Sequence, residues 1–257
     1  MSRIFVSFFA FAILFANPGT KIAPANSFVV VTPVQNAQEY DDLAEKEYLK
    51  QSKYWFGKPH RQLSTPCRIK IDVGNDKPSC GATSFEVRSR NQVLNFNMSV
   101  SGSKRNILRR VLPHEVCHVV LHSGLGRKIP RCFDEGAATL QEEESMHTWY
   151  ANYLKSKMPL RIRWVLDTYR YPERRYVLTF YAMSHVIAKH LVSMWGPKKY
   201  ISFLQDPRPP TKKLKAFYGI TPEELDTAWR KKIYTRTRRV VRSPIYVFSS
   251  KNYPPRS

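Results

Sequence analysis

Residues 113–122 read Pro-His-Glu-Val-Cys-His-Val-Val-Leu-His, and this stretch decides which fold and which chemistry we expect. Its apolar residues favour a helix, on which His114 and His118 are four residues apart and therefore lie on one face. Two such imidazoles are able to bind one Zn²⁺ through neutral nitrogens, and Glu115 between them is able to act as general base toward an activated water. The stretch therefore predicts a catalytic metal site with His114 and His118 as ligands and Glu115 as the base.

A third metal ligand is expected downstream, where residues 130–138 read Pro-Arg-Cys-Phe-Asp-Glu-Gly-Ala-Ala. Glu135 would open a second helix, and the small residues Gly136 and Ala137 would allow that helix to pack closely against the first. The Glu135 carboxylate would then complete a site of two histidines and one glutamate, with a fourth position left for water.

Other residues remain alternatives for the third ligand. His122 continues the four-residue spacing, but each such step turns a helix by about 40°, so we expect a hydrogen-bonded or exposed histidine there. Asp134 and residues 142–144 are the next candidates should Glu135 not bind the metal. The longer metzincin pattern is excluded because it needs glycine at 121 and histidine at 124, where the chain has Leu121 and Gly124.

Together, the two stretches resemble the gluzincins, most closely the peptidase MA-like group, which shares HExxH followed by Pro-x-x-x-Asp-Glu-Gly-x-Ala. The resemblance reaches from about residue 28 to about residue 234 and implies a zincin-like zinc metallopeptidase. It implies one Zn²⁺ per chain, bound by His114, His118 and Glu135, and a peptide or protein as substrate. Tyr181 occupies the place of the family's later tyrosine, which in aminopeptidase N-like relatives stabilises the oxyanion; the alternative is a core aromatic residue.

Three features depart from that family pattern. Cys132 stands where the family often has tryptophan, and the sixteen residues between His118 and Glu135 are two fewer than in the aminopeptidase N-like enzymes. The upstream segment 80–83, Cys-Gly-Ala-Thr, lacks the glutamate that would bind a free substrate amine. We therefore expect no aminopeptidase anchoring, with endopeptidase specificity or an unknown specificity left open.

The rest of the sequence predicts strands first and helices afterwards, which favours an α+β fold. Strands are expected at 28–34, at 68–73 and within 85–100, and helices at 37–54, 107–122, 180–195 and 222–234. Pro113 should break or restart the helix expected at 107–122, and Gly196-Pro197 should end the apolar helix expected at 180–195.

This order of elements divides the mature chain into three expected parts. Residues 26–150 should form a zincin-like lobe, with a small β-sheet, the HExxH helix and the third-ligand helix. Residues 151–235 should form a helical lobe, and residues 236–257 a basic tail.

The N-terminal residues 1–25 predict a signal peptide. Arg3 precedes an apolar run from Ile4 to Ala16, and Ala23-Pro24-Ala25 offers a small-x-small cleavage site. No apolar run reaches the roughly 18 residues of a membrane-spanning helix. We therefore expect export to the periplasm, the extracellular space or the cell surface, with a buried helix or an uncleaved anchor as the alternative.

Four cysteines are too few for a disulfide scaffold, but export would allow two bridges. Pairing between neighbours in the sequence would join Cys67 to Cys80 and Cys117 to Cys132, although sequence alone does not determine the connectivity. The absence of a C-x-x-C spacing argues against a four-thiolate metal site.

Basic residues outnumber acidic ones by 42 to 20, which gives a formal net charge of +22. A hydrophobic fraction of 42% excludes wholesale disorder, so the charge belongs to a globular protein. Such a charge indicates either a solvated surface or attraction to a polyanion. A non-catalytic module with a polyanion-binding surface, in which the metal site is structural or absent, is therefore the alternative to an enzyme. Aromatic residues interleaved with the C-terminal arginines favour it: Tyr234, Tyr246, Phe248 and Tyr253.

Overall fold

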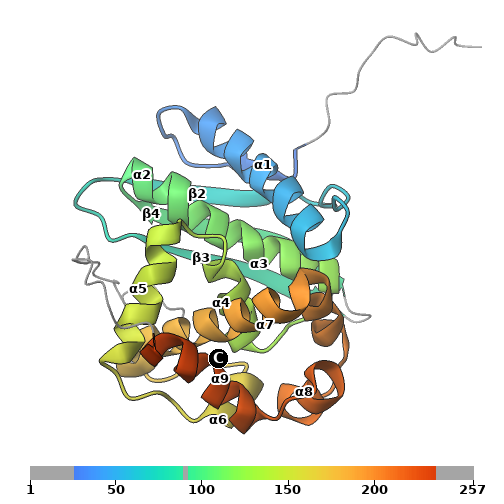
Figure 1. Ribbon diagram of the computed structural model, residues 1–257. Helices are drawn as coiled ribbons and strands as arrows, with labels where there is room; N and C mark the ends of the chain where they lie inside the picture. The colour runs from blue at the N-terminus through green and yellow to red at the C-terminus, as the bar shows by residue number, and fades with distance from the viewer. Residues whose placement is uncertain (1–25, 89–91, 236–257) are drawn as a thin grey trace, which may run out of the picture.

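The structure is a computed structural model that describes residues 26–88 and 92–235 (Figure 1). The predicted signal peptide at 1–25 and the predicted basic tail at 236–257 lie outside the described residues. The strands are β1 (Phe28–Val30), β2 (Cys67–Val73), β3 (Cys80–Arg88) and β4 (Gln92–Gly102). The helices are α1 (Ala37–Phe56), α2 (Lys104–Asn106), η1 (Ile107–Val111), α3 (Leu112–Leu125), α4 (Arg131–Thr139), α5 (Glu144–Lys155), α6 (Ile162–Asp167), η2 (Arg174–Tyr176), α7 (Val177–Gln205), α8 (Pro210–Tyr218) and α9 (Pro222–Thr235).

The four strands form one sheet in the order β1-β2-β4-β3. The strands β1, β2 and β4 are parallel, and β3 runs antiparallel to β4 at one edge of the sheet. Along β2, Cys67, Ile69 and Ile71 are buried, whereas the residues between them are exposed. This alternation is what a sheet covered on one face requires.

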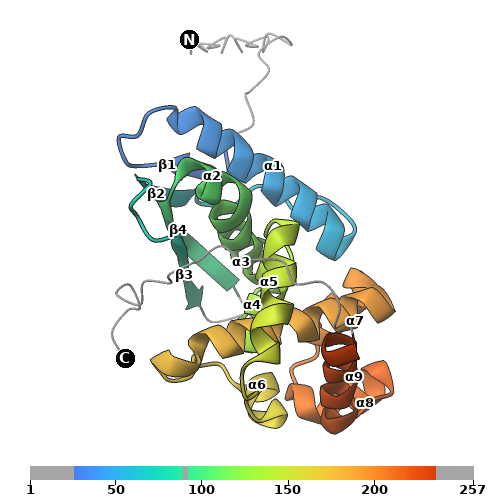
Figure 2. The same ribbon diagram turned by 60° about the vertical axis from the view of Figure 1, so that its left-hand side comes forward.

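Helices α1 and α3 pack against each other on the covered face of the sheet, as Figure 2 shows. A side-chain hydrogen bond ties them together, because Gln51 Nε2 of α1 donates to the carbonyl oxygen of Pro113 at 3.0 Å. The HExxH helix α3 is therefore held between the sheet and a second helix, and all its residues from Leu112 to His122 are buried.

The predicted effect of Pro113 takes the form of a change in hydrogen-bond spacing. In η1 the backbone adopts π-helical spacing, and the Leu112 amide donates to the Ile107 carbonyl five residues earlier. Proline has no amide hydrogen and its ring clashes with the carbonyl four residues before it, so a wider turn at this point relieves both problems. The α-helix restarts at Leu112, one residue before the predicted position.

The helix that carries Glu135 differs from the prediction in two respects. It begins at Arg131 rather than at Glu135, so Glu135 lies in its second turn. Gly136 allows close packing against α7 rather than against α3, because a Cβ atom there would lie 2.5 Å from the Ser184 carbonyl oxygen. The expectation that Gly136 faces the HExxH helix was therefore wrong.

Two of the predicted helix boundaries are confirmed. Gly196 has φ 81° and ψ 163°, so the long α7 is interrupted where Gly196-Pro197 was expected to end it. At the start of α9, the Thr221 amide donates to Glu224 Oε2 at 2.7 Å and the Glu224 amide donates to Thr221 Oγ1 at 3.2 Å. This reciprocal pair is a capping box.

The suggested disulfides are absent, since Cys67, Cys80, Cys117 and Cys132 are all free thiols. Cys67 precedes Arg68, which pairs with Asn97 of β4, whereas Cys80 pairs with Ser101 on the other side of that strand. At ~3.3 Å per residue, the two cysteines are offset by about 16 Å along β4. This offset exceeds the ~7 Å between Cα atoms that a disulfide tolerates.

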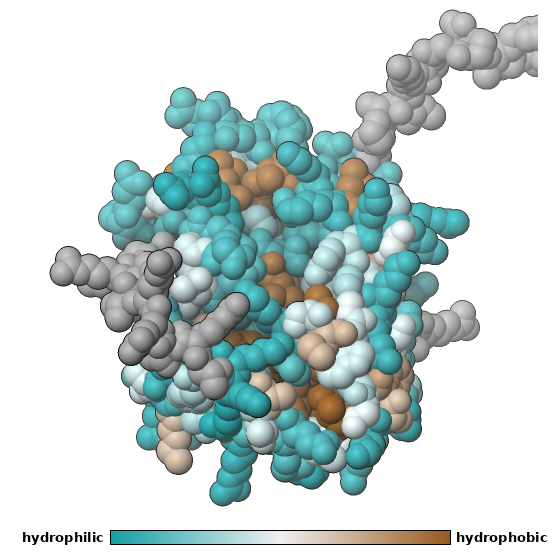
Figure 3. Space-filling model, viewed as in Figure 1, coloured by the Kyte–Doolittle hydropathy of each residue, from teal (hydrophilic) through white to brown (hydrophobic). Residues whose placement is uncertain are grey.

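The described chain is thus a mixed α+β protein with a small sheet, as expected. Residue 150, at the expected junction of two lobes, lies inside α5, and the division into lobes stays a prediction. None of the helices in the described ranges is long and apolar enough to cross a membrane. In Figure 3 the surface is mostly hydrophilic, with separate hydrophobic residues visible in the upper, middle and lower parts of this face.

Candidate metal centre

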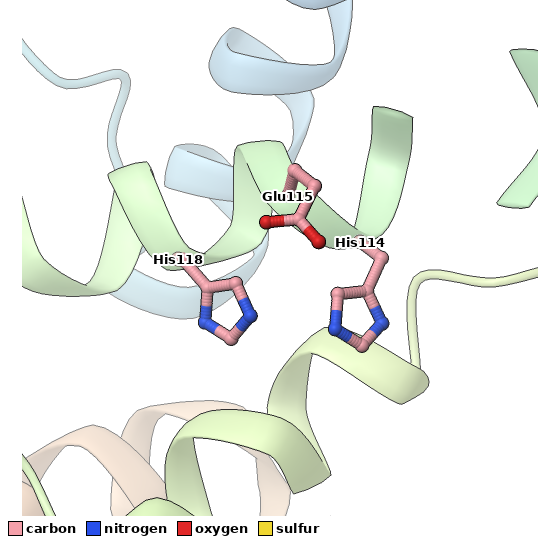
Figure 4. Close-up of side chains that lie close together, drawn as sticks. All are labelled: His114, Glu115 and His118. Atoms are coloured by element: carbon pink, nitrogen blue, oxygen red, sulfur yellow. The ribbon is translucent and has the colours of Figure 1, made fainter. Parts of the chain in front are cut away.

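The predicted ligands come together between α3 and α4. Figure 4 shows the imidazoles of His114 and His118 on the same side of α3, with Glu115 between them. Their Nε2 atoms lie 3.3 Å and 3.6 Å from the same oxygen of α4, Oε2 of Glu135. The three side chains are almost inaccessible to solvent, with exposed fractions of 8%, 6% and 0%. Two imidazoles and a carboxylate therefore converge on one buried point.

A separate carboxylate fixes the far nitrogen of each imidazole. His114 Nδ1 lies 2.7 Å from Glu142 Oε1, and His118 Nδ1 lies 2.7 Å from Asp134 Oδ1. With each Nδ1–H donated to a carboxylate, loss of the proton on Nε2 leaves a lone pair that points toward Glu135. Histidines that bind metals in proteins are usually oriented by such partners. Asp134 and Glu142, which the sequence analysis keeps as alternative ligands, each lie against the Nδ1 atom of one of these imidazoles.

Further residues hold Glu142 in place. The Tyr150 hydroxyl donates to Glu142 Oε1 at 3.1 Å, and Arg110 Nε lies 3.4 Å from Glu142 Oε2. A buried carboxylate is stable only when it is paired or hydrogen-bonded. The contacts of Glu142 with an arginine, a tyrosine and His114 meet that requirement.

His122 is buried and hydrogen-bonded, as expected. Its Nδ1 lies 2.9 Å from the Arg127 carbonyl oxygen, and its Nε2 lies 3.1 Å from Asp134 Oδ2. Asp134 thus accepts from two imidazoles, those of His118 and His122. These three side chains are also close enough to one another to hold an ion.

Glu115 lies against the edge strand β3. Thr83 Oγ1 donates to Glu115 Oε2 at 2.7 Å. Two residues earlier on the same face of the strand, Gly81 provides the space for this carboxylate, because a Cβ atom there would lie 2.5 Å from Glu115 Oε1. Burial raises the pKa of Glu115, against the opposing effect of His118 and His114. A carboxyl group with a raised pKa beside a metal site is suited to accept a proton.

Two tyrosines complete the site. Tyr181 was predicted, and its ring stacks on His114 with centroids 6.2 Å apart. Tyr171, which the sequence analysis missed, stacks on Tyr181 at 6.2 Å and an interplanar angle of 5°, and its hydroxyl donates to Glu135 Oε1. Tyr171 lies in the segment between α6 and η2, where no periodicity or motif marks it.

The charges of the site are balanced internally. Burial would raise the pKa of Asp134, but the imidazoles of His118 and His122 outweigh burial and hold it well below its usual value. The pKa of Glu135 is lowered in the same way by His118 and His114. Conversely, burial would lower the pKa of His114, but Glu135 and Glu142 raise it well above its usual value. A metal ion would therefore displace a proton from the imidazoles.

Comparisons of this chain with protein-family models, with curated proteins and with solved structures find no match. Buried groups of His, Glu and Asp in the described chain could hold a metal ion, and His114, Glu115 and His118 form one of them.

Proposed function

We propose that this chain is an exported zinc-dependent metallopeptidase of the gluzincin type. The observation that carries the proposal is the approach of His114 Nε2 and His118 Nε2 to one oxygen of Glu135, at 3.3 Å and 3.6 Å. Two imidazoles and one carboxylate are a common ligand set of catalytic zinc, which keeps its fourth position open. Because carboxylates hold both Nδ1 atoms, the donor set fits zinc once each Nε2 has lost its proton.

A zinc ion bound there would lower the pKa of a water molecule and polarise the carbonyl of a peptide bond. Glu115 is the residue that takes the proton from the attacking water, because its carboxylate is buried beside both imidazoles and its pKa is raised by burial. Thr83 orients this carboxylate by donating to Oε2, which leaves Oε1 to receive the proton. Glu115 then returns the proton to the leaving amine.

Tyr181 is the residue that donates a hydrogen bond to the oxyanion of the tetrahedral intermediate. Its ring stacks on that of His114, which places Tyr181 beside the proposed ligands. Tyr171 has a different role, because its hydroxyl already donates to Glu135 and so positions the proposed third ligand. A donor that meets developing charge typically contributes ~10²–10³ in turnover.

The edge strand β3 suggests how a peptide is bound. Among the described strands, β3 lies at the end of the sheet beside Glu115, so one of its sides has no strand partner. An extended peptide is able to pair with such an edge through main-chain hydrogen bonds. Segment 80–83 of this strand has no acidic side chain to bind a free amino terminus, which supports an enzyme without aminopeptidase anchoring.

Proteolysis by the zinc-loaded chain and by Glu115→Gln tests the proposal, with denatured proteins and a peptide library as substrates. We expect cleavage by the parent, and a loss on the order of 10²–10⁴ in Glu115→Gln. The variant keeps both imidazoles and the volume of the side chain, so zinc should stay bound. Lys46→Gln, at an exposed position on α1, is the control and should cleave the substrates like the parent.

If the parent binds zinc but cleaves no substrate, the non-catalytic binding module is the better description. If Glu115→Gln cleaves as fast as the parent, the assigned base is wrong.

A further inference from the structure

A cavity of about 1020 Å³ lies outside the metal centre, and its lining residues come from α5, α7 and α9. These three helices pack against one another, as Figure 1 shows. Tyr150 separates the cavity from the metal centre: its ring stacks on His185 of the cavity at 5.0 Å, while its hydroxyl donates to Glu142. None of the proposed metal ligands lines the cavity.

Several buried polar atoms of the lining residues have no hydrogen-bond partner within the described chain. They are His147 Nε2, His185 Nε2, His190 Nδ1 and Trp229 Nε1. His185 is completely buried and His190 is 8% exposed. Such atoms are rare in folded proteins, because leaving each one unpaired costs free energy. Four of them around one cavity indicate a polar ligand.

The charge of the lining indicates an anion. Lys155, Lys189 and Lys232 line the cavity, against the single carboxylate of Glu144. That carboxylate is already engaged, because its Oε2 lies 3.1 Å from His147 Nδ1 and its Oε1 lies 3.8 Å from Lys189 Nζ. The lining therefore has a net charge of two positive units when its imidazoles are neutral.

Neutral imidazoles suit this role. Burial, followed by the Lys189 ammonium, lowers the pKa of His147, and burial, followed by the Lys232 ammonium, lowers the pKa of His190. A neutral imidazole has one N–H donor. His147 and His185 donate theirs from Nδ1 to Glu144 and Thr139, so His190 is the imidazole among these three that keeps an N–H for a ligand. Three lysines close to the imidazoles also argue against a second metal ion, which would be repelled.

Apolar groups make up the remainder of the lining. Val186 and Ile233 are buried there, and the nearly fully buried ring of Trp229 lies beside them. A volume near 1000 Å³ corresponds to the upper end of cavities for small organic ligands. The ligand should therefore have an apolar body as well as a charged group.

We propose that this cavity binds a small organic phosphate monoester with a flat apolar body. A phosphate monoester carries a charge of about −1.5 to −2 near neutral pH, which matches the net charge of the lining better than a carboxylate does. The lysines and the N–H group of His190 would bind the phosphate, and the apolar body would lie beside Trp229.

Isothermal titration of the full chain with phenyl phosphate tests this proposal. Phenol and inorganic phosphate are the two partial ligands for comparison. The titrations use both zinc-loaded and chelator-treated protein, so that phosphate bound at the metal centre is recognised by its dependence on zinc. We expect zinc-independent binding of phenyl phosphate that is tighter than that of either partial ligand.

The double variant Lys189→Gln/Lys232→Gln removes two cations at exposed positions, where folding is not at risk. It should weaken binding about tenfold or more, since charge-assisted hydrogen bonds are the strong ones. Lys46→Gln/Lys53→Gln on α1 removes the same charge far from the cavity and should leave binding unchanged.

Equal weakening in both double variants would mean non-specific attraction to a basic surface, and would overturn the proposal. So would binding that requires zinc, phenol binding as tightly as phenyl phosphate, or no binding by the parent. Binding of a second zinc ion that is lost in His147→Gln would overturn it in favour of a metal site.

Discussion

Glu142 and Asp134 hold the imidazoles of His114 and His118 from behind, and neither role could be predicted from the sequence. The four-residue spacing of the histidines is a local property of a helix, so the sequence reveals it directly. Glu142 is 28 residues away from His114, and which nitrogen it meets depends on how α4 and the segment after it return to α3. The sequence could identify these acids as candidate metal ligands, but not which imidazole nitrogen each of them contacts.

Tyr171 illustrates the same limit more strongly. Its contact with Glu135 spans 36 residues and comes from a segment without regular structure. Tyr181 was found only because the chain resembles a family with a tyrosine at that place. Both aromatic rings then stack on each other beside the metal centre.

Tyr181→Phe tests the role of the predicted tyrosine. Turnover should fall by roughly 10²–10³, because one donor to the oxyanion is lost. The midpoint of thermal unfolding and the zinc content should stay unchanged, since the ring and its stacking are kept. Tyr176→Phe, at an exposed position just before α7, is the matched control. A lower unfolding midpoint with turnover preserved would instead assign Tyr181 to the core.

Among the elements, β3 connects the fold to the chemistry most directly. The sequence predicted at least one strand within 85–100, and the structure contains two, of which β3 begins earlier, at Cys80. The residues of β3 show no clean alternation of buried and exposed positions, so the periodicity that reveals β2 is missing. An edge strand beside a site has polar residues where a core strand has apolar ones.

Gly81→Ala tests the contact between β3 and Glu115. The added Cβ would lie 2.5 Å from Glu115 Oε1 and 2.6 Å from its Cγ, so the carboxylate must move away from its present position. We expect peptide hydrolysis to fall by about 10-fold or more, since small misplacements of a catalytic group are costly. Zinc content should be unaffected, because Gly81 touches no ligand. The measurement is turnover of a peptide substrate together with zinc content.

Ala82→Ser adds one heavy atom at the next residue of the same strand and should leave turnover unchanged. Equal activity of Gly81→Ala and the parent would show that Glu115 does not need its place beside β3.

For the whole molecule, the order of strands and helices was sufficient to predict an α+β fold. The sequence did not reveal that α7 packs against α4 through Gly136, because the identity of a packing partner depends on the three-dimensional path of the chain. The pairing of cysteines failed for the same reason. Cys67 and Cys80, neighbours in the sequence, lie on different strands, and the sheet keeps them apart.

Alkylation with iodoacetamide tests the arrangement of the thiols. Burial raises the pKa of Cys67 and of Cys132 to about 12, and it raises that of Cys117 well above its usual value. Only thiolates react readily, so these three should resist labelling in the folded protein. Cys80 is less buried and should react first. Intact-mass measurement should find four adducts after denaturation, one for each cysteine of the chain.

Cys80→Ser should abolish labelling of the folded protein. Rapid labelling of Cys67 or Cys132, or a parent mass lowered by the two hydrogens lost per bridge, would contradict the arrangement.

The zinc content of Glu135→Ala tests the central claim most directly. The protein is first passed through gel filtration in a buffer that contains a weak chelator. Metal analysis should then find about one zinc per chain in the parent, as a single site with one open position requires. Glu135→Ala should retain almost none, with an affinity lowered by more than ~100-fold, beyond the usual cost of losing a supporting residue. Glu173→Ala, an exposed acid outside the site, should bind zinc like the parent. Zinc retained by Glu135→Ala at the parent's affinity, or a folded parent without zinc affinity, would contradict the assigned metal centre.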